Sequence, residues 1–142
     1  MSSVIRVGIG VLVHKSQDNV RVLIAKRPDT GVLPGYWEFP GGKLEPNESL
    51  EHCVVREFEE ELGAKVRILS QLDSVLHKYD YGTVELNPFF CEWLGGELQN
   101  HAVVDHQWVR PEDLLNFSFP EANTKLVEQV IRELTHGMAL AS

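Results

Sequence analysis

A glycine-rich loop followed by a strongly acidic stretch is the feature that most restricts how this chain can fold. The loop contains Gly41 and Gly42, and the acidic stretch occupies residues 56–63. Glutamates at this density repel one another and weaken a helix unless cations hold them. Three of them, at positions 57, 60 and 61, have the i, i+3, i+4 spacing that places side chains on one helical arc of about 100°. Magnesium takes oxygen ligands and is commonly shared between carboxylates and phosphates, so the pattern predicts a metal-phosphate site.

The composition fits one soluble domain with a local excess of acid. The chain has 142 residues, 43% of them hydrophobic, and a net charge of −8 from 13 Lys and Arg against 21 Asp and Glu. Phosphate backbones are bound mainly by Lys and Arg, so we expect no nucleic-acid polymer and no membrane as partner. A small polyphosphate remains compatible, because metal ions bridge two negative partners. We expect a monomer.

The N-terminal region has no signal-peptide pattern, and no apolar run is long enough to span a membrane. We therefore expect a cytoplasmic location. Two cysteines, Cys53 and Cys91, are too few for a secreted disulfide framework and are expected to be reduced and buried.

Hydrophobic patterning predicts seven strands and two main helices. Asn47 is the expected N-cap of the first helix, which runs to Leu62 and stops at Gly63. Pro88 inside a strand run indicates a bulge or a sheet edge. A short helical turn is expected at 111–115, a hairpin turn at 15–19 and the second helix at about 123–135. The expected strands are 4–14, 20–25, 36–39, 65–69, 74–79, 84–94 and 106–109. Mixed strands with two flanking helices predict an α+β sandwich.

The loop and helix residues match the Nudix box at every spacing, although Ala64 is smaller than the usual aliphatic residue after the final glycine. The matching residues are Gly42, Glu48, Arg56, Glu57, Phe58, Glu60, Glu61 and Gly63. The chain thus resembles the Nudix hydrolase family. The resemblance implies one domain over residues 1–142, with the box at 42–64 and a mixed β-sheet between helices in an α/β/α sandwich. It also implies metal-dependent cleavage of a nucleoside diphosphate linked to another group, with Mg²⁺ as cofactor and Mn²⁺ as a substitute.

Within the acidic arc, Glu57, Glu60 and Glu61 are the expected metal ligands, assisted by the carbonyl of Gly41. The alternative is a solvent-exposed acidic helix face. By the same resemblance Arg56 and Glu48 form an ion pair that holds the loop and the helix together. The five charged residues, 48, 56, 57, 60 and 61, form the predicted catalytic set.

Flanking segments resemble the MutT branch of the family, the 8-oxo-dGTP diphosphatases. These segments are Arg27, residues 37–43 and residues 119–123. The resemblance implies that Asn123 hydrogen-bonds the oxidised guanine, while Glu38, Phe39, Gly41 and Gly42 line the nucleotide pocket. Asn123 also suits an N-cap, and Phe39 also suits the core. Arg27 is expected to meet a phosphate or the sugar, with simple exposure as the alternative.

One position departs from the MutT branch. That branch has a further acid six residues before the last tryptophan, and here the position is Ala102. Glu97 and Asp105 lie nearby. Glu57 is the first choice for the general base and Asp105 the second.

Together these features predict a nucleoside triphosphate pyrophosphohydrolase that uses water to release a nucleoside monophosphate and pyrophosphate. The favoured substrate is 8-oxo-dGTP. The alternatives are another modified nucleotide, such as a cytidine triphosphate, and a nucleotide-binding sensor without catalysis.

Overall fold

The structure, a computed structural model, describes residues 4–28 and 35–135. Its helices are α1 (Leu50–Leu62) and α2 (Thr124–Thr135), with short 3-10 helices η1 (Pro111–Asn116) and η2 (Glu121–Asn123). Its strands are β1 (Val4–Ser16), β2 (Asn19–Lys26), β3 (Trp37–Glu38), β4 (Gly41–Lys43), β5 (Lys65–Gln71), β6 (Val75–Tyr79), β7 (Gly82–Gly95) and β8 (Asp105–Val109). Every predicted strand is present within a few residues, and β4 is additional.

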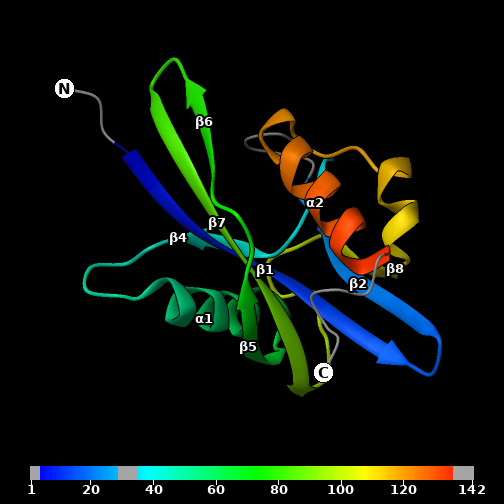
Figure 1. Cartoon of the computed structure of the whole chain (residues 1–142). Coiled ribbons are helices and arrows are strands. Elements are labelled where there is room, and N and C mark those ends of the chain that lie inside the picture. The colour runs from blue at the N-terminus through cyan, green and yellow to red at the C-terminus, as the bar shows by residue number, and fades with distance from the viewer. Residues whose placement is uncertain (1–3, 29–34, 136–142) are drawn as a thin grey trace.

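The eight strands form one mixed sheet between the two helices, with α1 on one face and α2 on the other (Figure 1). The strand path is β3-β2-β1-β7-β5, with β4 beside β1, β6 beside β7 and β8 beside β2. Among the described strands, only β1 and β7 pair in parallel, from Val4 opposite Thr83 to Val13 opposite Glu92. The predicted α+β sandwich with a mixed sheet is confirmed.

Strand β7 has partners on both sides, so the expectation of a sheet edge at Pro88 is wrong. Pro88 pairs with Ile9 of β1, and its carbonyl accepts a bond of 2.9 Å from the backbone N–H of Leu72. Leu72 lies in the gap between β5 and β6, where the ladder along that side of β7 is interrupted. A proline is tolerated there because no strand residue requires its missing N–H. The bulge lies in β5, between Ile68 and Ser70.

Helix α1 begins later than the sequence predicts. Its N-cap is Ser49, whose hydroxyl accepts a bond of 3.1 Å from the backbone N–H of His52. Asn47 is not the cap but lies in the preceding turn with a φ of 65°, a left-handed conformation that asparagine adopts more readily than most residues. The helix ends as predicted at Gly63, which has a φ of 67° and donates its N–H to the carbonyl of Glu59.

The apolar face of α1 is fixed closely against the sheet. Phe58 is fully buried, and a Cβ at Gly10 of β1 would lie 2.2 Å from its ring. Val54 and Leu62 are buried in the same cluster, together with Leu12, Leu23, Phe89 and Cys91 of the sheet. Since Phe58 lies between the glutamates at 57 and 59–61 in the chain, this packing sets the direction in which the acidic arc points.

Helix α2 covers the other face through Leu126, Val127, Val130 and Leu134. It begins at Thr124, directly after η2, and among the described residues no side-chain hydrogen bond from Asn123 caps its first turn; the backbone N–H of Asn123 donates to the carbonyl of Pro120 at 2.9 Å. Pro111 occupies the first turn of η1 as expected. The hairpin turn is shorter than predicted, because β1 extends to Ser16 and β2 begins at Asn19. No helix of residues 4–28 or 35–135 is both long and apolar enough to cross a membrane.

Candidate active site

Strand β4 brings the two glycines of the loop against α1. β4 pairs with β1, with Gly41 opposite Ile9 and Gly42 opposite Gly8. A Cβ at Gly42 would lie 2.6 Å from the carboxyl carbon of Glu57, and a Cβ at Gly41 would lie 2.2 Å from the carbonyl oxygen of Gly8. Any side chain at Gly42 would therefore displace the Glu57 carboxylate. Gly42 thus lets β4 approach α1 closely, and Gly41 lets it approach the backbone of β1.

Arg56 ties the loop to the helix. Its guanidinium donates to both carboxylate oxygens of Glu48, at 2.6 and 2.9 Å, and to the backbone carbonyl of Lys43 at 3.3 Å. It also donates to Glu57 at 2.8 Å and to Glu60 at 3.2 Å. The bond from Arg56 holds the pKa of Glu48 far below its ordinary value. The structure thus brings together the two residues that the resemblance pairs.

A cluster of three carboxylates, from Glu38, Glu57 and Glu61, lies beside Gly41 of β4. Burial raises the pKa of Glu61, and a hydrogen bond with Glu57 and the negative charges of Glu38 and Glu57 raise it further. A backbone hydrogen bond from Gly41 opposes the rise. Glu61 is therefore protonated more readily than an ordinary glutamate, because it is buried beside two other carboxylates. The resemblance assigns Glu38 to the nucleotide pocket, and in the structure its negative charge also acts on the predicted metal ligand Glu61.

The oxygen donors fit a hard divalent ion, although they are not arranged around one point. Within the described ranges, no three His, Cys, Asp or Glu side chains are positioned to hold a metal as they stand. Arg56 accounts for this, because it draws Glu57 and Glu60 toward its guanidinium, and the Glu60 side chain is 58% exposed. Two carboxyl groups that lie this close together are nevertheless a donor set that a divalent cation would stabilise. Glu57 and Glu61 are the residues best placed to hold it, with Glu60 after rotation away from Arg56.

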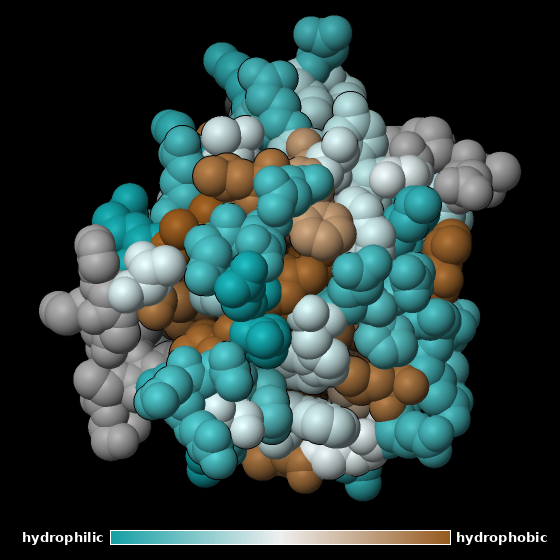
Figure 2. Space-filling model, turned by 90° about the vertical axis from the view of Figure 1, so that its right-hand side faces the viewer, coloured by the Kyte–Doolittle hydropathy of each residue, from teal (hydrophilic) through white to brown (hydrophobic). Residues whose placement is uncertain are grey.

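The predicted base-recognition residues lie on the α2 side of the sheet. Phe39 is 3% exposed in the cluster that packs against α2, and its ring lies 5.4 Å from the ring of Phe119. Asn123 is half-buried, and no hydrogen bond of its side chain is found among the described residues. The face of the molecule on the right of Figure 1 shows hydrophobic patches between polar side chains (Figure 2). Phe39 thus has the core role given as an alternative, while the amide of Asn123 is available to a ligand.

The segment around Ala102 closes the C-terminal end of α1. The backbone N–H groups of His101 and Ala102 donate to the carbonyl of Glu61 at 2.9 and 3.2 Å. Leu23 and Ala25 of β2 pack on the α1 side, so the next residue, Lys26, points to the opposite face. Asp105 of β8 is the register partner of Lys26 and therefore also lies on the face opposite α1. The geometry therefore favours Glu57 over Asp105 as the general base. Glu97 is exposed.

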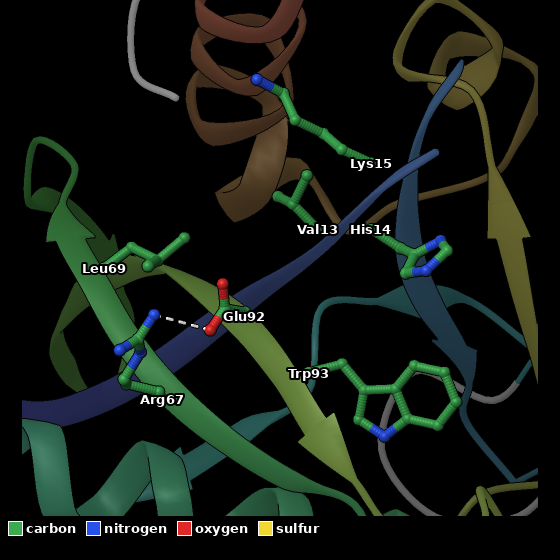
Figure 3. Close-up of a pocket in the computed structure, with 7 residues that line it drawn as sticks. All are labelled: Val13, His14, Lys15, Arg67, Leu69, Glu92 and Trp93. Carbon is green, nitrogen blue, oxygen red and sulfur yellow. Dashed lines mark hydrogen bonds and ion pairs between the residues drawn. The ribbon is translucent and has the colours of Figure 1, made fainter. Parts of the chain in front are cut away.

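A surface pocket of about 390 Å³ lies elsewhere, at the ends of β1, β5 and β7 (Figure 3). Its lining includes Arg67 and Glu92, which form an ion pair of 2.7 Å across β5 and β7. The neighbours of Arg67 in the chain, Val66 and Ile68, pack toward α1, so Arg67 and Glu92 project from the opposite face. This pocket contains none of the predicted site residues.

Comparison with known proteins gives one family and several relatives. A family model described as a NUDIX domain matches residues 10–129. An 8-oxo-dGTP diphosphatase of Proteus vulgaris is 39% identical over 90 residues, covering 63% of this chain and 78% of that protein. A CTP pyrophosphohydrolase of Escherichia coli K12 is 33% identical over 111 residues, covering 76% of this chain and 80% of that protein.

Two solved structures extend the likeness over most of the fold. The solution structure of the E. coli ORF135 protein has a TM-score of 0.80 at 28% identity and covers 97% of this chain and 96% of that one. A MutT structure, from a study of the Aliivibrio salmonicida and Vibrio cholerae proteins, has a TM-score of 0.71 at 34% identity and covers 92% of this chain and 99% of that one.

Proposed function

Because the chain belongs to the NUDIX domain family, we propose that it is a divalent-metal-dependent hydrolase that converts 8-oxo-dGTP to 8-oxo-dGMP and pyrophosphate. The observation that carries the proposal is the pair of carboxylates of Glu57 and Glu61, packed against a glycine loop that leaves room for the Glu57 carboxylate. The free amide of Asn123, within a segment that resembles the MutT branch, supports oxidised guanine as the base.

Each residue has a distinct task in this reaction. Water attacks the β-phosphorus, the bridging oxygen leaves with the nucleoside monophosphate, and Glu57 accepts the proton of the water. A bound Mg²⁺, for which Mn²⁺ would substitute, neutralises phosphate charge and acidifies water. Arg56 and Glu48 keep Glu57 at the loop, and Gly42 leaves room for the Glu57 carboxylate beside the backbone.

The side chain of Asn123 offers a donor and an acceptor to the edge of the base. That combination suits a purine whose hydrogen-bonding pattern changes on oxidation. It also suits a cytosine, and the CTP pyrophosphohydrolase is similar over a larger share of this chain than the P. vulgaris protein. A cytidine triphosphate is therefore the second candidate substrate.

We expect purified protein with Mg²⁺ to hydrolyse 8-oxo-dGTP at a higher kcat/KM than dGTP, CTP or 5-methyl-dCTP. Pyrophosphate and the monophosphate should appear in equal amounts, and chelation by EDTA should abolish both. The measurement is product quantification by ion-exchange chromatography. Equal kcat/KM values for the oxidised and normal guanine nucleotides would refute the substrate, and a cytidine preference would replace it with the second candidate. Release of orthophosphate in place of pyrophosphate would refute the bond that is cleaved.

Asn123→Ala should remove the preference for oxidised guanine and leave most of kcat intact. A buried hydrogen-bonding group left unpaired costs about 1–3 kcal/mol, so kcat/KM for 8-oxo-dGTP should fall by about 5- to 150-fold, mainly through KM. Hydrolysis of dGTP should change little. Thr124→Ala, at the exposed neighbouring position, is the matched control. A variant that keeps the wild-type ratio of 8-oxo-dGTP to dGTP activity would show that Asn123 does not read the base.

A further inference from the structure

Arg27 and Glu38 form an ion pair next to the predicted metal site. Arg27 donates to Glu38 at 2.8 Å, and their side chains are 29% and 25% exposed. The pair joins the end of β2 to β3, because Ala25 pairs with Glu38 and the backbone N–H of Arg27 donates to the carbonyl of Tyr36 at 2.8 Å. Both residues therefore have a position fixed by the sheet.

Strand alternation shows which face of the sheet the pair occupies. Trp37 and Phe39 pack in the cluster on the α2 side, so Glu38 between them points toward α1. Leu23 and Ala25 pack on the α1 side, and Arg27 continues their alternation. The pair consequently lies on the face that carries the acidic arc of α1, and not on the face that carries Asn123.

Electrostatics agrees with this placement. The negative charge of Glu38 acts on Glu61, and that of Glu57 acts on Glu38. Glu38 thus belongs to one group of three carboxylates with Glu57 and Glu61. Arg27 is the cation that neutralises its outer member.

We propose that the Arg27–Glu38 pair adjusts the charge of the metal site according to whether a nucleotide is bound. Without nucleotide, Arg27 neutralises Glu38 and weakens the attraction of the site for a divalent ion. A nucleotide phosphate attracts Arg27, and the charge of Glu38 then adds to that of Glu57 and Glu61. The metal is held more tightly once the substrate has arrived. This inference rests on the proposed function, since it requires a phosphate ligand and a metal at that site.

The test is Mn²⁺ binding by the whole protein, measured by electron paramagnetic resonance of the free ion, with no nucleotide present. Arg27→Met should tighten the dissociation constant of Mn²⁺, because it removes a positive charge and leaves Glu38 uncompensated. Glu38→Gln should weaken it. We expect about threefold or more in each direction. The opposite signs distinguish a charge effect from a loss of structure, which would weaken binding in both variants.

A second measurement adds a non-hydrolysable guanosine triphosphate analogue. The wild-type protein should bind Mn²⁺ more tightly with the analogue than without it, and this gain should shrink in both variants. The matched controls are the two single variants Arg67→Met and Glu92→Gln. They change an Arg–Glu pair of similar length, 2.7 Å, on the opposite face. These control variants should leave Mn²⁺ binding unchanged, and thermal melts should confirm that all variants are folded.

The Mn²⁺-binding results distinguish failure of the charge adjustment from failure of the proposed hydrolase function. Weaker or unchanged Mn²⁺ binding in Arg27→Met overturns the proposed charge adjustment while leaving the hydrolase assignment intact. Absence of Mn²⁺ binding by the wild-type protein, with and without the analogue, overturns both. Tighter binding in Arg27→Met with weaker binding in Glu38→Gln supports the inference.

Discussion

Glu57→Gln is expected to lower kcat for nucleoside triphosphate hydrolysis by about 10²- to 10⁴-fold, the range for loss of a general base. The substitution removes the proton acceptor and one carboxylate of the metal site, while an amide of the same shape still fits against Gly42. A fall in kcat with an unchanged thermal midpoint would therefore reflect the lost carboxylate and not misfolding. The measurement is initial rate at saturating substrate and Mg²⁺, together with the thermal midpoint. A decrease of less than about tenfold would remove Glu57 from its role as base.

Other glutamates of α1 supply graded controls for this result. Glu59 is exposed and projects away from the arc, so Glu59→Gln should leave kcat near wild type. Glu61→Gln should be nearly as damaging as Glu57→Gln, because Glu61 is the other predicted metal ligand and lies beside Glu57. Glu60 is bonded to Arg56 and largely exposed, so its substitution should have an intermediate effect. Equal losses in all four variants would indicate a general effect of helix charge and not a defined site.

The sequence was sufficient to predict the layers of this fold because its patterns are local. Alternating or continuous apolar runs mark strands, and Val54, Phe58 and Leu62 at helical spacing mark the buried face of α1. The end of α1 was equally readable, since a left-handed glycine stops a helix. The start of α1 could not be predicted, because Asn47 and Ser49 are both good capping residues. Only the path of the chain from β4 decides between them.

The site was predictable in its residue types and less so in its grouping. The spacing of Glu57, Glu60 and Glu61 on one arc follows from helix geometry alone. Which carboxylates lie close together depends instead on where β3 places Glu38 and where Arg56 directs its guanidinium. Those are contacts between segments distant in sequence. Alternation along the predicted strand at 36–39 was one available signal: with Trp37 and Phe39 facing the core on one side, Glu38 points to the other side, toward α1.

Arg56→Met is expected to lower the thermal midpoint on the order of 5–10 °C at pH 7.5 and to abolish most activity. The Glu48 side chain is only 5% exposed and loses its bidentate partner, while Glu57 and Glu60 lose the cation between them. Removing one partner of a buried pair leaves the other charge uncompensated. Arg110→Met, in an exposed pair with Asp113, is the control and should change the midpoint little.

Acid should narrow the difference between Arg56→Met and the wild type. In the folded wild type the pKa of Glu48 is far below its ordinary value of 4.5, so Arg56 stabilises the fold above about pH 4.5 and this contribution is lost as the pH falls below it. In the variant Glu48 no longer has a guanidinium partner. Protonation at low pH then relieves the repulsion among the three carboxylates that Arg56 had bonded, Glu48, Glu57 and Glu60. The two midpoints, measured by circular dichroism at pH 7.5 and pH 4.0, should therefore converge at the lower pH. A gap that stays constant or widens would mean that Arg56 stabilises the protein through packing and not through the charge of Glu48.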